Sequence, residues 1–227
     1  MPTLFVTGTD TDCGKTHVSV ALLHALAARG KSAVGYKPVA AGCERDPTGL
    51  SNADARALWA ASAPGFDYVD INPVTLEPPI APHVAADDLD LAIDPAALIE
   101  GAVALQSRSE WVVVEGAGGF RVPLNAQQDF ADMVEAAAWP VLLVVGMRLG
   151  CINHALLSVE AIQRRAPLLG WVANVLPPEQ PRLGENIAAL QDRISAPCLG
   201  IVRAATPQQA ADEIDVEQLE SILRKTS

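Results

Sequence analysis

A short run near the start of the chain has the composition of a phosphate-binding loop. It follows the apolar segment 3–7 and reads Gly8-Thr9-Asp10-Thr11-Asp12-Cys13-Gly14-Lys15-Thr16. Between a strand and a helix, the backbone N–H groups of such a loop bind phosphate oxygens, the lysine adds a positive charge, and the last hydroxyl can bind a phosphate-linked magnesium ion. The run has one residue more than the usual motif before its Gly-Lys pair. An ordinary glycine-containing turn is the alternative.

Three further polar residues come at the ends of apolar runs that are typical of strands: Lys37, Glu115 and Asn174. Ligands of an open parallel sheet bind at the carboxyl ends of its strands, so these side chains could share a cleft with the phosphate loop. There a lysine could face phosphates, a carboxylate could be a second magnesium ligand, and an amide could read a purine edge. The alternatives are a solvated lysine, a structural strand-end carboxylate and a turn asparagine.

Two helix starts could also carry chemistry. Gly150 precedes a predicted helix, whose N-terminal amides could bind an anion such as a carboxylate with help from Arg148, whereas Cys151 could simply be a small buried residue. Asp54 lies near the start of another predicted helix, and its spacing from Ser51 resembles a capping box. From spacing alone, a capping role for Asp54 is preferred over a metal-binding role.

The elements that must position these residues alternate along the chain. Apolar runs predict strands at 3–7, 32–36, 111–115, 141–145, 169–174 and 198–202. Amphipathic patterns and start signals predict helices at 15–29, 51–62, 95–107, 129–138, 152–166, 182–194 and 207–224. Their alternation predicts an α/β fold in which an open parallel sheet carries helices on both faces. We expect one domain over 1–227, with a long irregular, substrate-facing excursion at 63–93.

The composition of the chain argues against some classes of binding partner and cellular compartment. The formal net charge is −11, which argues against nucleic acid and against an anionic membrane surface as partners. No apolar run is long enough to span a bilayer, and the N-terminus carries no secretory signal. The 4 cysteines show no CxxC pair, which favours reduced thiols in a cytoplasm over disulfides or zinc.

Several blocks together resemble one family, the dethiobiotin synthetases, which are ATP-dependent enzymes of biotin biosynthesis. The blocks are the phosphate loop with its extra residue, 35–39, 114–119, 150–154 and 170–174. The resemblance implies a P-loop NTPase-like fold, Mg²⁺ as cofactor, a homodimer, and the substrates 7,8-diaminononanoate, CO₂ and ATP. One amine of the diamine would take up CO₂ as a carbamate, which attacks the γ-phosphate of ATP. The second amine would then close the ureido ring and expel phosphate.

The resemblance also implies roles for individual residues. Lys37 and Lys15 would be catalytic, and Thr16, Asp54 and Glu115 would bind the metal, which reverses the preference for Asp54 as a cap. The diamine would be bound by Thr11, Lys37, Gly150, Cys151 and Asn153, with its carboxylate tail held at the 150–153 helix start across the dimer interface. The nucleotide would be bound by Asp12, Cys13, Gly14, Lys15, Thr16, His17, Asp54, Glu115, Gly116, Ala117, Gly118, Asn174 and Val175, with Asn174 reading adenine.

Three departures and three rival classes accompany this interpretation. The segment 200–203 lacks the proline that usually follows the last strand in this family. Ala41 stands where many relatives have serine, and Arg148 stands where lysine is frequent. A partitioning-type or nitrogenase-iron-protein-like ATPase switch is the first rival, but it carries an extra lysine early in the loop, where this chain has Asp10. A GTP-binding module usually needs an Asn-Lys-x-Asp motif, which this sequence lacks. A non-catalytic relative is the third rival, which only an activity measurement excludes.

Overall fold

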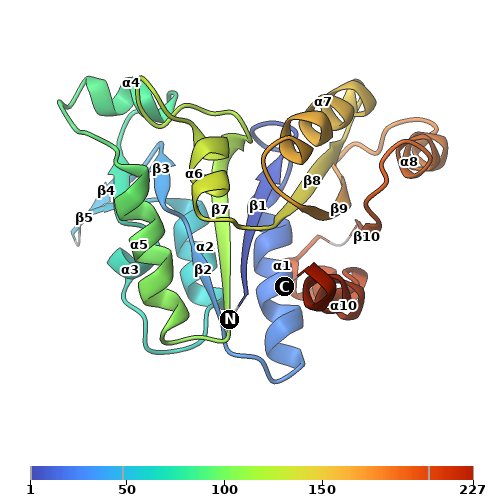
Figure 1. Cartoon of the computed structure of the whole chain (residues 1–227), viewed down its shortest axis with the longest axis horizontal. Helices are drawn as coiled ribbons and strands as arrows, with labels where there is room; N and C mark the ends of the chain where they lie inside the picture. The colour runs from blue at the N-terminus through green and yellow to red at the C-terminus, as the bar shows by residue number, and fades with distance from the viewer. Residues whose placement is uncertain (1, 48, 204, 227) are drawn as a thin grey trace.

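The computed structural model describes residues 2–47, 49–203 and 205–226. Within these residues the central sheet has six parallel strands in the order β10-β9-β8-β1-β7-β2, seen from one face in Figure 1. They are β1 (Thr3–Gly8), β2 (Ala33–Tyr36), β7 (Trp111–Gly119), β8 (Val141–Met147), β9 (Leu168–Val175) and β10 (Cys198–Val202). All six predicted strands are confirmed. The two ends of the predicted domain, residues 1 and 227, lie outside the described residues.

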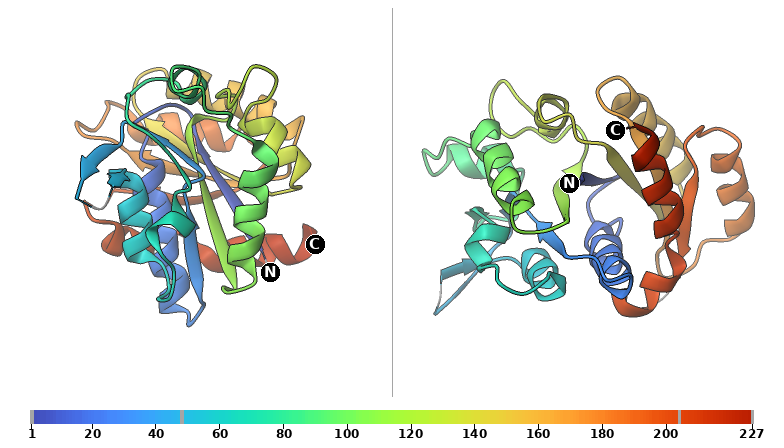
Figure 2. Two further views of the ribbon diagram at one scale, coloured as in Figure 1. Left: turned by 90° about the vertical axis from the view of Figure 1, so that its left-hand side faces the viewer. Right: turned by 60° about the horizontal axis from the view of Figure 1, so that its bottom comes forward.

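Helices cover both faces of this sheet, as the sequence predicts. Helices α1 and α2 pack on one face and α5, α6 and α7 on the other, which the left panel of Figure 2 shows from the side of the β2 edge. The bounds are α1 (Lys15–Ala28), α2 (Ala53–Ala61), α5 (Pro95–Gln106), α6 (Phe130–Ala136), α7 (Cys151–Gln163) and α8 (Leu183–Gln191). Buried aliphatic and aromatic side chains fill both interfaces, and Phe5 of β1 contacts the rings of Phe120 and Phe130. No helix in the described parts is long and apolar enough to cross a bilayer.

The 63–93 segment contains more regular structure than the sequence indicates. It includes α3 (Tyr68–Ile71), β6 (Val74–Leu76) and α4 (Pro82–Asp87). Strand β6 pairs in parallel with β3 (Val39–Ala41), and β4 (Glu44–Asp46) pairs with β5 (Gly49–Ser51) in a small hairpin. These elements are only 3 to 6 residues long, which is too short for a hydrophobic period to be recognised. Helix α4 begins at a proline and lies over the carboxyl ends of the strands, at the top of Figure 1.

One predicted helix is divided in the structure, and another is capped by a different residue. The predicted helix 207–224 is divided into α9 (Pro207–Ala210), a 3₁₀ turn (Ala211–Glu213) and α10 (Val216–Thr226). Ile214 is extended there because it bridges to Gly200, and the Asp215 N–H donates to the Leu199 carbonyl at 2.7 Å. Pairing with the sheet therefore overrides helix propensity. Helix α2 is capped by Asn52 rather than through the Ser51–Asp54 spacing.

The order of the strands determines where a ligand site can form. The chain runs from β1 outward to β2, returns to β7, and then continues with β8 on the other side of β1. The carboxyl end of β1 is thus a switch point, which is where open α/β sheets bind ligands. Tyr36 of β2 is level with Val114 of β7, so the next residues, Lys37 and Glu115, are neighbours at that end of the sheet.

Candidate functional site

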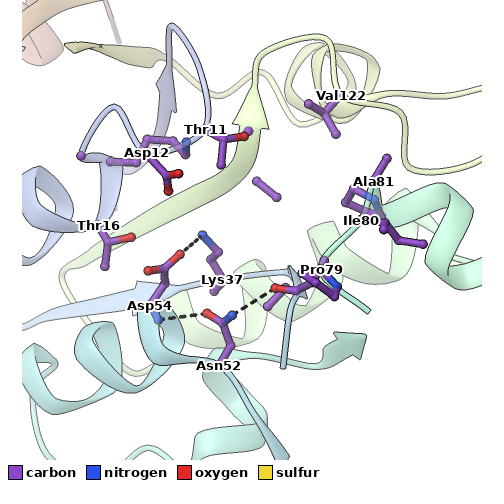
Figure 3. A pocket seen from close by; sticks show the side chains of 17 residues that line it. Thr11, Asp12, Thr16, Lys37, Asn52, Asp54, Pro79, Ile80, Ala81 and Val122 are labelled. Carbon is purple, nitrogen blue, oxygen red and sulfur yellow. Dashed lines mark hydrogen bonds and ion pairs between the residues drawn. The ribbon is translucent and has the colours of Figure 1, made fainter. Parts of the chain in front are cut away.

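A cavity of about 730 Å³ opens at the carboxyl end of β1. One wall is polar and includes Thr11, Asp12, Lys15, Thr16, Lys37, Asn52 and Asp54. The other side is apolar and includes Pro79, Ile80, Ala81 and Val122, which Figure 3 labels, together with Pro82. The glycines and alanines that complete the lining are Gly14, Ala40, Ala41, Ala117 and Gly118. The cavity can therefore take a ligand with charged groups at one side and an aliphatic chain at the other.

Lys37 is the centre of a compact ion cluster on the polar wall. Its Nζ donates to Glu115 Oε1 at 2.6 Å, to Asp54 Oδ2 at 3.2 Å and to the Gly116 carbonyl at 3.4 Å. Thr16 Oγ1 donates to the same Glu115 oxygen at 2.8 Å. Lys37 and Glu115 are buried, whereas the Asp54 carboxylate is half exposed to the cavity. Side chains from β2, β7, α1 and α2 thus meet at one point.

The cluster sets the charge of its members. Burial acts to lower the pKa of Lys37, but the nearby carboxylates of Glu115 and Asp54 outweigh it, and the pKa is raised. Burial acts to raise the pKa of Asp54, but Lys37 and hydrogen bonds from Lys37 and Thr16 lower it. Both groups are therefore charged at neutral pH. Lys37 can stabilise an anion here, but a protonated ammonium cannot serve as a general base.

The phosphate loop has the backbone geometry that its sequence predicts. Gly14 is the N-cap of α1 and has a left-handed φ of +91°. Asp12 also has a positive φ, of 58°, so the loop turns sharply before the helix. Lys15 is largely buried, and its Nζ donates to the Asp10 carbonyl at 2.9 Å. The helix N-terminus and Lys15 make one positive corner of the cavity.

Some oxygen atoms of this corner suit a magnesium ion. Glu115 Oε2 is buried and accepts no hydrogen bond within the described parts of the chain, and the Thr16 hydroxyl and Asp54 carboxylate lie on the cavity wall. Hard oxygen ligands of this kind, few in number and completed by phosphate oxygens and water, are typical of Mg²⁺ sites. The described residues hold no cluster of three or more His, Cys, Asp or Glu side chains that could bind a metal alone.

Asn174 lies beside the phosphate loop rather than in the cavity wall. It ends β9 level with Gly146, is buried, and its Nδ2 donates to the Cys13 carbonyl at 3.0 Å. A Cβ atom on Gly14 would come within 1.9 Å of this nitrogen. Asn174 therefore packs directly against the phosphate loop. The two were predicted to bind the same ligand. Cys13 itself is buried beneath the loop.

The start of α7 lies apart from the cavity. Gly150 is its N-cap, with a φ of +96°, followed by buried Cys151 and exposed Asn153. None of these three lines the cavity within the described parts of the chain. Arg148, which lies shortly before α7, is ion-paired with Asp10 of the phosphate loop. This ion pair connects the start of α7 with the phosphate loop.

Sequence reasoning missed part of the site. Asn52 and the stretch 79–82 line the cavity but were not predicted as site residues, although the excursion that holds 79–82 was expected to face the substrate. Asn52 could have been found as the better N-cap, because its side chain accepts from the N–H groups of Asp54 and Ala55. The apolar wall carried only its prolines as a signal, at Pro78, Pro79 and Pro82.

Comparisons with known proteins agree with this geometry. A family model described as "AAA domain" matches residues 2–211. The chain is similar to the ATP-dependent dethiobiotin synthetase BioD of Cellvibrio japonicus (strain Ueda107), with 50% identity over 219 residues that cover 95% of this chain and 96% of that protein. A protein of the same name from Pseudomonas aeruginosa (strain LESB58) is 46% identical over 224 residues, which cover 96% and 98% of the two chains.

Solved structures with a similar fold are more distant. The cell division ATPase MinD of Pyrococcus furiosus matches with a TM-score of 0.59 and 16% identity, covering 100% of both chains. The cell division protein FtsY of Thermotoga maritima matches with a TM-score of 0.53 and 15% identity, covering 96% of this chain and 68% of that one. Identity this low supports a shared phosphate-loop fold and nothing finer.

Proposed function

The chain belongs to the ATP-dependent dethiobiotin synthetase family, and we propose that it converts 7,8-diaminononanoate, CO₂ and ATP to dethiobiotin, ADP and phosphate. The ion cluster of Lys37 with Glu115 and Asp54, on the same polar wall of the cavity as Lys15, is the observation that carries this proposal. A carbamate and a polyphosphate repel each other, so the reaction needs fixed cations where they meet. Charge that develops on the transferred phosphoryl group is stabilised by the same cations.

We assign the catalytic roles as follows. One amine of the diamine forms a carbamate, and a carbamate oxygen attacks the γ-phosphorus, giving a carbamic–phosphoric anhydride and ADP. The second amine attacks the carbamoyl carbon, loses its proton, and expels phosphate as the ring closes. Lys15 would bind the γ-phosphate, and Lys37 would neutralise the carbamate. The raised pKa of Lys37 supports this role, because a lysine held protonated stabilises anions throughout both steps.

The metal would be held by Thr16, Asp54 and Glu115. A bound Mg²⁺ would supply positive charge to the phosphate oxygens. The unpartnered Glu115 Oε2 supports this assignment, since a buried carboxylate oxygen is costly without a hydrogen-bond donor or a cation. The nucleotide would run from the loop residues Asp12, Cys13, Gly14 and His17 past Gly116, Ala117 and Gly118. Its base would reach Asn174 and Val175, which end β9 beside the loop.

The diamine would lie along the cavity with its amines near Thr11 and Lys37. Its carboxylate tail would bind at Gly150, Cys151 and Asn153 of a partner subunit, because this helix start does not line its own cavity in the described structure. Leu149 and Leu157 beside it are 97% and 58% exposed, and a partner subunit bound at this helix start would cover them. We therefore propose a homodimer. Leu157→Asp should shift the sedimenting species to the monomer and raise KM for the diamine, whereas Val103→Asp, on the exposed face of α5, should do neither.

Two further proposals concern the domain organisation and compartment of the protein and its classes of partner. All of 1–227 would act as one domain in the cytoplasm, which the four free thiols, all in the described parts of the chain, support. No nucleic-acid or membrane partner is proposed, given the net charge of −11. The rival ATPase switch rests on structural likeness to MinD at 13–16% identity, whereas the synthetase relatives match nearly the full length.

The test is a phosphate-release assay with the diamine, bicarbonate, Mg²⁺ and ATP. Release above the control without diamine is expected, together with a product containing the ureido ring. Lys37→Ala should abolish turnover and leave nucleotide affinity within about two-fold. Lys31→Ala is the matched control, because Lys31 makes only an exposed ion pair with Glu110. Phosphate release that does not depend on the diamine would refute the proposed function and favour an ATPase switch.

A further inference from the structure

The backbone of Lys37 is held by the segment that follows α3, not by the central sheet. The paired register of β2 with β7 ends at Tyr36. Beyond it, the Lys37 N–H donates to the Ile71 carbonyl at 2.7 Å, and Asn72 Nδ2 donates to the Lys37 carbonyl at 2.7 Å. Asn72 is 2% exposed and also donates to the Val74 carbonyl at 3.2 Å. The backbone position from which the Lys37 side chain extends is therefore determined by α3 and its C-terminal cap, Asn72.

The same segment also holds the helix that carries Asp54. The Asn52 N–H donates to Tyr68 Oη at 2.8 Å, and Tyr68 Oη donates to Asn72 Oδ1 at 3.1 Å. Asn52 Oδ1 in turn accepts from the Asp54 N–H at 3.0 Å. Together with the bond from Lys37 Nζ to Asp54 Oδ2, these contacts form a closed ring of five residues, in which each donates to the next: Lys37, Asp54, Asn52, Tyr68 and Asn72.

We propose that Tyr68 and Asn72 are positioning residues, which fix the distance between the Lys37 ammonium and the Asp54 carboxylate through this ring. Neither residue lines the cavity in the described structure, so they act through Lys37 and Asp54. The Tyr68 hydroxyl accepts from the Asn52 N–H, just before α2, and donates to Asn72, which binds the Lys37 carbonyl. The catalytic part of this inference rests on the proposed function, and its geometric part does not.

The physical reason is the tight spacing around Lys37. Its Nζ is shared between carboxylate oxygens at 2.6 and 3.2 Å, and Glu115 on β7 cannot follow a shift of α2. Hydrogen bonds in one donor-to-acceptor direction also strengthen each other at low dielectric. If the ring opens, α2 can shift away while Glu115 stays, and the cation loses its position relative to the phosphates. A misplacement of about 1 Å can reduce the rate of the chemical step by about 100-fold.

If Tyr68 only stabilised the fold, its variant should behave like any other variant of similar stability. Ser62 provides the control for this alternative. Ser62 Oγ accepts from the Gly35 N–H at 2.9 Å, which joins α2 to β2 at the opposite end of the helix. Tyr68→Phe and Ser62→Ala each remove one hydroxyl between the same two parts of the fold. Both should lower thermal stability by a similar amount, but only Tyr68→Phe opens the ring.

The experiment compares steady-state kinetics and crystal structures of the two variants. For Tyr68→Phe we expect kcat to fall by about 10-fold or more, with KM for ATP within about two-fold of wild type. Its crystal structure should show the Lys37 Nζ–Asp54 Oδ2 separation beyond about 4 Å, the limit of an ion pair. For Ser62→Ala, kcat and the separation should stay near wild type. Equal kcat in the two variants, or an unchanged 3.2 Å separation in Tyr68→Phe, would overturn the proposal.

A second variant covers the case in which Tyr68→Phe does not fold. Asn72→Asp keeps the acceptor for Tyr68 and removes the amide donor to the Lys37 and Val74 carbonyls, so it should reduce kcat in the same way. If this variant has wild-type kcat and geometry, the ring has no positioning role. If the wild-type protein shows no diamine-dependent turnover, the proposed function fails, but the crystal geometry of the variants still decides whether the ring positions Lys37.

Discussion

Gly14→Ala tests the packing of the phosphate loop against β9. Gly14 has a φ of +91°, and an added Cβ would lie 1.9 Å from Asn174 Nδ2. A non-glycine residue in the left-handed region costs about 1–2 kcal/mol. Displacing Asn174 also breaks its bond to the Cys13 carbonyl, and a buried polar group left without a partner costs about 1–3 kcal/mol.

The expected loss in the free energy of unfolding is the sum of these two costs less one gain. The gain is about 0.4–1 kcal/mol, because alanine restricts the conformations of the unfolded chain. We therefore expect the free energy of unfolding to fall by about 2–4 kcal/mol in Gly14→Ala. Nucleotide affinity should fall with it, since the displaced loop no longer presents its N–H groups to the phosphates.

Gly30→Ala separates backbone strain from the clash. Gly30 also has a positive φ, of +73°, but an added Cβ there meets no atom within 4 Å. This control should lose only about 1 kcal/mol or less. Urea unfolding of both variants gives the two free energies, and isothermal titration gives nucleotide affinity. If the two variants lie within about 0.5 kcal/mol of each other, the close contact between Gly14 and Asn174 is refuted.

Two further predictions concern α6. The Asp132 carboxylate accepts from the Asp129 N–H in a capping box, and that bond and Arg165 lower its pKa. Its contribution is present above the unfolded pKa and is lost as pH falls through the folded pKa. Asp132→Asn should therefore cost about 1 kcal/mol at neutral pH, and the difference in unfolding free energy should vanish once the pH lies below the lowered pKa of Asp132; a constant difference would contradict this. Ala138 follows α6 with a φ of 51°, so Ala138→Gly should raise the melting temperature by removing about 1 kcal/mol of strain, whereas Ala136→Gly, in the last helical turn, should lower it.

The sheet could be predicted because its signals are local and strong. Continuous apolar runs such as 141–145 are expected only where both faces of a strand are covered. Asp94-Pro95 has the sequence of an N-cap followed by proline at the first helical position, and α5 begins there. The break at Ile214 could not be predicted, because it depends on pairing with Gly200, which is distant in sequence. The short elements α3 and β6 carry no periodicity and exist through contacts with 37–43.

The residues of the candidate site also divide into those that could be predicted from the sequence and those that could not. Lys37 and Glu115 could be predicted to meet because parallel strands end together at one edge of a sheet, whatever the details of the loops. The contacts of Asn52, Tyr68 and Asn72 could not be predicted, since each depends on the path of a loop that no sequence pattern describes. Strand ends thus determine which side chains reach the cavity, and loop contacts determine how closely they are held.

The balance of charge in the cavity explains why so many groups converge on it. Lys15 and Lys37 are opposed by Asp54 and Glu115, so the formal charges of these four side chains sum to zero. Both lysine side chains are held in place before any phosphate arrives, because Lys15 donates to a carbonyl and Lys37 is ion-paired with Glu115. A triphosphate and a carbamate then bring more negative charge than two lysines offset. Under the proposed function, the same carboxylates that hold Lys37 protonated would also be the ligands of a divalent cation, so one set of oxygens would serve both purposes.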